Sequence, residues 1–111
     1  MRRVSLVCAL AMLAAPAVAE VWIETSYYTC ERGAEVTATH VGKDSDAAVV
    51  LLIEGNQIGL PVTRSGSGVR YAEPGGGYVW HEKGRSALLL WEEGDTTQAI
   101  YSDCQSEYPA P

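Results

Sequence analysis

The sequence has little of what a metal site, a cofactor site or a membrane span requires. Its only histidines are His40 and His81, and neither has a cysteine or a second histidine at the spacing of a metal-ligand pair. No apolar run approaches the roughly 20 residues that a membrane-spanning helix needs. Internal repeats, linkers and coiled-coil heptads are missing too, and the one biased segment is a short glycine run. We therefore expect one domain without metal ion or cofactor.

Catalytic motifs are also missing. The segment 65–68 reads SGSG and superficially resembles a nucleophile elbow, but that motif needs a following helix and partner residues further on. Glu92 and Glu93 are adjacent, so on a strand they would point to opposite faces and could not form a catalytic pair. The glutamates at expected strand ends are interpreted as solvated surface charges: Glu54, Glu73 and Glu82. We predict that the protein is not an enzyme.

The first 19 residues are typical of a secretory signal peptide. Two arginines and an apolar run over residues 4–15 precede the small residues 17–19, which form the pattern that signal peptidase recognises. We expect cleavage after Ala19, so that residues 1–19 are the signal and residues 20–111 form one periplasmic domain.

Only two of the three cysteines belong to this expected mature domain. Cys8 lies within the signal. It could be a lipid-attachment site, but Val7 stands where a lipoprotein signal has a small residue, so cleavage after Ala19 is favoured. Cys30 and Cys104 remain, and an even pair in a short exported domain indicates a disulfide. Closing the long loop between them should stabilise the fold by roughly 4 kcal/mol.

Basic residues are scarce. Without the two arginines of the signal, 6 of the 8 lysines and arginines remain against 14 acidic residues, a net charge of −8. A domain this acidic should repel nucleic acid and anionic lipid, and it should attract basic partners. We therefore expect no nucleic-acid partner and no membrane anchor after cleavage.

The mature chain has an all-β pattern. Short runs rich in β-branched and aromatic residues alternate with turn residues at close spacing. We expect eight strands, at residues 23–30, 35–41, 47–54, 58–63, 69–72, 78–82, 87–91 and 98–104. Short strands of this number favour a small antiparallel up-and-down barrel, which hides its edges by closing. A two-sheet sandwich is the alternative.

Two motifs in the second half are the most informative. Residues 65–71 read SGSGVRY, and residues 78–84, after a glycine loop, read YVWHEKG. Here the chain resembles the membrane-bound and periplasmic inhibitors of C-type lysozyme, which have a Ser-x-Ser-Gly-x-x-Tyr segment followed by an aromatic strand ending in Lys-Gly. The apolar strand and the segments around both cysteines match as well, so the resemblance covers nearly the whole mature chain.

The resemblance implies an eight-stranded barrel tied by Cys30 and Cys104, and a C-type lysozyme as the partner. It also implies that Ser67 and Lys83 enter the lysozyme cleft. That cleft holds one protonated and one ionised carboxyl group. A lysine ammonium can pair with the ionised group, and a serine hydroxyl can both donate and accept. Arg70 is expected to support the loop or to contact the rim of the target.

Several features depart from the family or allow other interpretations. The loop 72–77 looks about two residues longer than in the membrane-bound members, and His81 stands where an aromatic residue is frequent. The aromatic residues of the motifs are interpreted as barrel wall or core: Tyr71, Tyr78 and Trp80. The alternative functions are a barrel that binds a hydrophobic or glycan ligand in its interior, and a cell-wall hydrolase with an unrecognised carboxylate pair.

Overall fold

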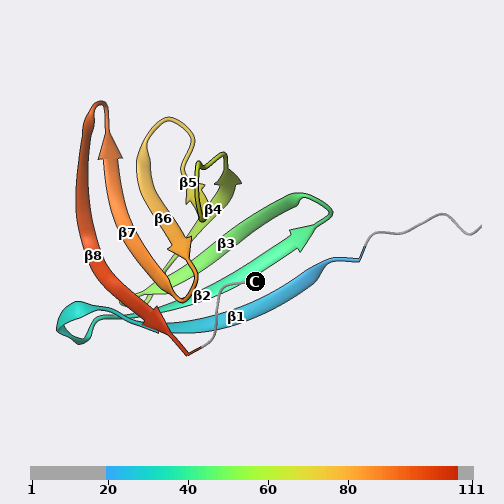
Figure 1. The fold of residues 1–111 in the computed structure, drawn as a ribbon, viewed down its shortest axis with the longest axis horizontal. Coiled ribbons are helices and arrows are strands. Elements are labelled where there is room, and N and C mark those ends of the chain that lie inside the picture. Colours follow the sequence, from blue (N-terminus) through green and yellow to red (C-terminus); the bar gives the residue numbers. More distant parts are fainter. Residues whose placement is uncertain (1–19, 108–111) are drawn as a thin grey trace, which may run out of the picture.

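Residues 20–107, which the computed structural model describes, form a closed antiparallel barrel in which each strand pairs with the next along the chain (Figure 1). The strands are β1 (Trp22–Thr29), β2 (Glu35–Lys43), β3 (Asp46–Ile53), β4 (Asn56–Thr63), β5 (Val69–Ala72), β6 (Gly77–Lys83), β7 (Ser86–Glu93) and β8 (Thr96–Ser106). A short 3₁₀ turn, η1 (Glu31–Gly33), links β1 to β2. The predicted all-β barrel of eight strands is confirmed, and the sandwich alternative is not.

The expected signal peptide, its cleavage after Ala19 and Cys8 lie outside the described residues. Within residues 20–107, no helix is long and apolar enough to cross a membrane.

Local sequence explains why the hairpins form where they do. In β2 the side chains alternate strictly between the interior and the outside, as the two-residue period of a strand requires. The β3–β4 turn has Glu54 and Gly55 as its central residues, both with positive φ (52° and 83°), between the paired residues Ile53 and Asn56. Positive φ at both central positions matches the right-handed twist of the flanking strands, which keeps the hairpin tight.

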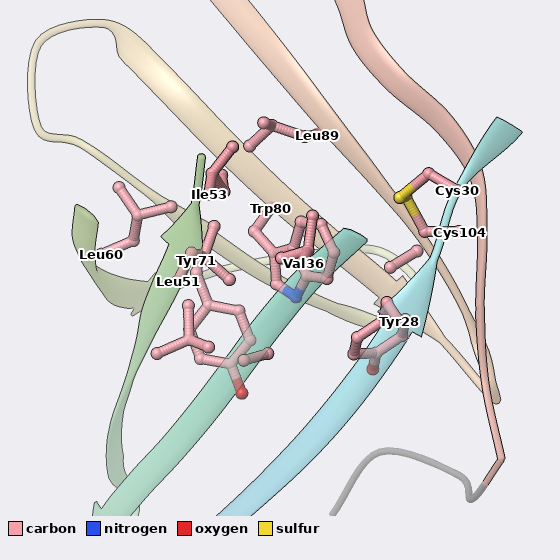
Figure 2. Close-up of a cluster of buried hydrophobic side chains, with 13 residues drawn as sticks. Tyr28, Cys30, Val36, Leu51, Ile53, Leu60, Tyr71, Trp80, Leu89 and Cys104 are labelled. Carbon is pink, nitrogen blue, oxygen red and sulfur yellow. A yellow bond between two sulfur atoms is a disulfide. The ribbon is translucent and has the colours of Figure 1, made fainter. Parts of the chain in front are cut away.

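Side chains fill the barrel interior (Figure 2). The largest completely buried ones are those of Trp80, Tyr28, Leu51, Leu60 and Leu89. The rings of Tyr28 and Trp80 meet edge to face, with centroids 5.1 Å apart. A barrel of this size is expected to be filled in this way, and the filling disfavours an internal ligand.

The interpretation of the motif aromatics as barrel wall or core is confirmed. Tyr71 and Trp80 are buried in the core. Tyr78 is half-buried on β6, where it packs against the core and edge to face on Trp91, with the ring centroids 5.0 Å apart.

The predicted disulfide between Cys30 and Cys104 is present (Figure 2). It lies beside the seam at which the first and last strands meet. Only Tyr28 and Thr29 of β1 have partners on β8. This seam and the seam between β4 and β5 therefore have the fewest paired residues in the barrel. The covalent bond therefore reinforces the closure of the barrel at a point where the hydrogen-bonded ladder is shortest.

Candidate functional site

Strand pairing brings the two motifs to the same end of the barrel. On the β5–β6 hairpin, Val69 lies opposite Glu82 and Arg70 lies opposite His81. The next residues outward on the two strands are Gly68 and Lys83, so the serine loop and the lysine turn are neighbours. Ser67 and Lys83 are both exposed. The two residues that the family resemblance singled out are therefore presented together to solvent.

The serine loop, residues 64–68, is folded tightly against β6. The carbonyl oxygen of Ser67 accepts a hydrogen bond from Ser65 Oγ at 2.6 Å, and His81 Nε2 lies 2.9 Å from the same oxygen. Gly68 has a φ of 68°, and a Cβ atom there would lie 2.3 Å from the backbone oxygen of Glu82. Only glycine fits both the backbone conformation and the available space.

Lys83 ends β6, and the chain turns back through Gly84, with a φ of 63°, to Ser86 opposite it. Among the described residues Lys83 takes part in no ion pair, so its ammonium is available to a partner. An open groove of about 450 Å³ runs beside it on the outer wall. The groove is lined by His81, Lys83, Ser86, Ala87, Leu88, Asp103 and Gln105.

Arg70, by contrast, is already engaged. Its guanidinium donates to Glu92 Oε1 at 2.6 Å and to Thr63 Oγ1 at 3.2 Å. These contacts link β4, β5 and β7 just beneath the serine loop. Glu92 faces Arg70, while the neighbouring Glu93 is exposed and accepts a hydrogen bond from Trp91 Nε1 at 3.3 Å. The expected opposite orientation of the two glutamates agrees with these separate partners.

The interpretation of Glu82 as a solvated strand-end charge is wrong. Its side chain is 1% exposed and lies in the barrel interior with His40, which is 0% exposed. Glu82 Oε2 is hydrogen-bonded to His40 Nε2 and accepts from Trp80 Nε1 at 2.7 Å and Tyr28 OH at 3.5 Å. The two-residue period of β6 already placed Glu82 on the same face as Trp80. That signal predicts an inward carboxyl group.

Two tyrosines near Glu82 have raised pKa values: Tyr28, which belongs to this buried network with His40 and Trp80, and the neighbouring Tyr71. Burial and the nearby Glu82 carboxyl group raise the pKa of Tyr71 to about 12. The same two causes raise the pKa of Tyr28 even further above its ordinary value. A phenolate in this place would lose its hydration and lie close to a carboxyl group, so the neutral phenol is favoured. Because Glu82 immediately precedes Lys83, the network also anchors the strand end that carries the lysine.

The serine loop and the lysine turn lie at the open end of the β5–β6 hairpin, opposite its own turn. Together with the fold they define the class: a small disulfide-closed barrel that presents a serine loop and a lysine turn. Within that class the chain belongs to the family of membrane-bound lysozyme inhibitors of C-type lysozyme, MliC, whose model matches residues 28–98. The match includes both motifs. The match confirms the predicted family. Because this family consists of lysozyme inhibitors, the prediction that the protein is not an enzyme is confirmed as well.

Solved structures show the same fold. MliC from Pseudomonas aeruginosa, crystallised in complex with hen egg white lysozyme, is 23% identical, with a TM-score of 0.62 over 90% of this chain and 98% of that one. The periplasmic inhibitor of C-type lysozyme PliC from Salmonella typhimurium is 20% identical, with a TM-score of 0.63 over 76% and 96%. The Adhesin Complex Protein from Neisseria meningitidis is 22% identical, with a TM-score of 0.57 over 76% and 99%. A comparison with curated protein sequences gives no match.

Proposed function

We propose that this protein inhibits a C-type lysozyme by inserting Ser67 and Lys83 into the catalytic cleft. The main support is that strand pairing brings two separate motifs to one end of the barrel, with both side chains exposed and the Lys83 ammonium without an ion partner among the described residues. The complex of the Pseudomonas aeruginosa relative with hen egg white lysozyme supports a C-type lysozyme as the target.

The mechanism is occlusion of the active site. The ammonium of Lys83, on its long flexible stem, pairs with the ionised carboxylate of the cleft, and the hydroxyl of Ser67 hydrogen-bonds to the carboxyl groups. Both side chains occupy space that the sugar chain needs, so hydrolysis stops without any bond being broken. The inhibitor therefore requires no catalytic base of its own.

The charge of the domain supports rapid encounter. Residues 20–111 have a net charge of −8, which steers the protein toward a basic enzyme. Lys83 is then a local positive probe on an acidic body. We place the protein in the periplasm, in line with its signal-like first 19 residues.

Arg70 acts in this proposal as a support. Its pairing with Glu92 and Thr63 holds β5 in place below the serine loop, so its side chain contributes to the shape of the rim.

The test is an assay of C-type lysozyme on a bacterial cell-wall suspension, with and without the oxidised protein comprising residues 20–111. We expect loss of lysozyme activity at a one-to-one ratio. The variant K83A should lose about 2–5 kcal/mol of binding free energy, as expected when one partner of a buried charged pair is removed. The variant S67A should lose roughly 1–3 kcal/mol.

The chain offers a matched control, because Lys43 is its other lysine and also lies exposed at a hairpin end, between β2 and β3. The variant K43A should inhibit as well as the parent. If K83A and S67A also inhibit like the parent, the site assignment is wrong. If the parent inhibits none of several C-type lysozymes, the proposed function itself is wrong.

A further inference from the structure

We infer that His81 is a positioning residue that holds the serine loop in the conformation needed for inhibition. The inference rests on the proposed function, since it assigns to His81 the task of orienting Ser67. An aromatic residue is frequent at this position in the inhibitor family, so the resemblance assigns no role to His81.

The contact is specific. His81 Nε2 lies 2.9 Å from the carbonyl oxygen of Ser67 and 3.5 Å from Ser65 Oγ. A carbonyl oxygen can only accept, so the ring nitrogen carries the proton and donates. Both the neutral tautomer protonated at Nε2 and the imidazolium can make this bond. The bond is therefore retained in either charge state of the ring.

The two donors that meet at this carbonyl oxygen do different things. Ser65 belongs to the loop itself, so its 2.6 Å bond to Ser67 only tightens the loop internally. His81 lies on β6, so its bond ties the loop to the barrel wall. His81 and Lys83 are two residues apart on one strand and therefore project from the same face. The ring thus links the position of Ser67 to the strand that carries Lys83.

The backbone around the contact leaves the loop little alternative packing. Gly68 approaches the backbone oxygen of Glu82 so closely that no Cβ atom fits, and its Cβ position would also lie 3.2 Å from His81 Nε2. The loop therefore rests directly on residues 81 and 82. Without the donor at residue 81, Gly68 keeps its close contact with Glu82, but the bond between β6 and the Ser67 carbonyl oxygen is lost and residues 64–67 are free to move.

Two substitutions separate the donor from the ring. H81F keeps an aromatic ring of similar size and removes the donor, whereas H81Q places an amide N–H close to the position of Nε2. A double-mutant cycle with S67A in the lysozyme inhibition assay then measures the coupling. In the parent, S67A should weaken inhibition by about 5- to 150-fold. In the H81F background the loop no longer holds Ser67 in place, so the further effect of S67A should fall to about twofold. Effects of independent substitutions add to within about twofold, so a larger departure from additivity measures coupling. The H81Q background should restore it.

The matched control is K83A, whose fold-effect should be the same in the H81F and parent backgrounds. A second readout needs no lysozyme. Arg64 is exposed at the start of the loop, so tryptic cleavage after it should be faster in H81F than in the parent or in H81Q.

The outcomes distinguish the two proposals. If S67A weakens inhibition equally in the parent and H81F backgrounds, or if H81F does not accelerate cleavage after Arg64, His81 does not position the loop, while the proposed function stands. If S67A has no effect in the parent, the role of Ser67 and the inference about His81 both fail.

Discussion

Replacing Glu82 by leucine should destabilise the barrel more than any change of a surface carboxylate. The carboxyl oxygen Oε2 accepts bonds from Trp80 and Tyr28 and is bonded to His40. E82L leaves Trp80 and His40 buried without this partner, whereas Tyr28 keeps its hydrogen bond to Ser106. Each buried donor that is left unsatisfied costs about 1–3 kcal/mol, and removing one member of a buried charged or hydrogen-bonded pair typically costs about 3–5 kcal/mol in total. We expect E82L to lose about 3–5 kcal/mol.

Such a loss is a large part of the roughly 5–15 kcal/mol by which small domains are stable, so a milder variant is needed beside it. E82Q keeps the shape and one acceptor oxygen and should cost less than E82L. The control is E93L, because Glu93 is an exposed strand-end glutamate and such surface changes usually lie within about 0.5 kcal/mol.

The assay is urea denaturation of the oxidised protein, followed by the fluorescence of its tryptophans, with the free energy of unfolding taken from the midpoint and slope. A double-mutant cycle with H40L tests the network directly. The double variant should cost less than the sum of H40L and E82L, because both single changes break the same bond. A loss below about 1 kcal/mol for E82L, or strict additivity with H40L, would refute the account of the buried network.

Two further predictions concern alkaline pH and the glycines of the serine loop. The raised pKa values of Tyr28 and Tyr71 mean that their contribution to stability is complete below pH 10, the ordinary phenol value, and is lost as the pH rises through the folded values. The free energy of unfolding, measured by urea denaturation, should therefore decline between pH 10 and 12 by about 1.4 kcal/mol per pH unit for each phenol. Y71F should show a shallower decline, and a flat profile would contradict the assignment. G68A should weaken lysozyme inhibition, because its Cβ atom would meet the backbone of Glu82, whereas G66A, with open space around its Cβ position, should inhibit like the parent in the same assay; equal behaviour of the two variants would show that the loop is not seated as described.

Much of this protein could be predicted from local sequence. The eight strands lie where the β-branched and aromatic runs predict them, because strand formation depends on residues that are neighbours in the chain. The pairing of Cys30 with Cys104 follows from counting the cysteines that lie outside the expected signal peptide. The family is also recognisable, since the serine and lysine motifs are short and contiguous.

The burial of Glu82 and the engagement of Arg70 were harder to see. A glutamate before a Lys-Gly turn looks solvated. Two of the partners of its carboxyl group, His40 and Tyr28, lie 42 and 54 residues earlier in the chain. Arg70 likewise meets Glu92 across a distance of 22 residues. Such partners depend on which strands are neighbours around the barrel.

Sequence by itself therefore predicted the strands, the disulfide and the inhibitor motifs, because each is encoded in residue type and short-range order. The export signal is an expectation of the same kind. Only the tertiary structure decided between the barrel and the sandwich, brought the motifs of Ser67 and Lys83 to one end of the barrel, and placed the His81 ring against the serine loop. The physical reason is that ring closure and strand register are non-local. They arise from the packing of residues far apart in the chain around one core, and no short segment specifies them alone.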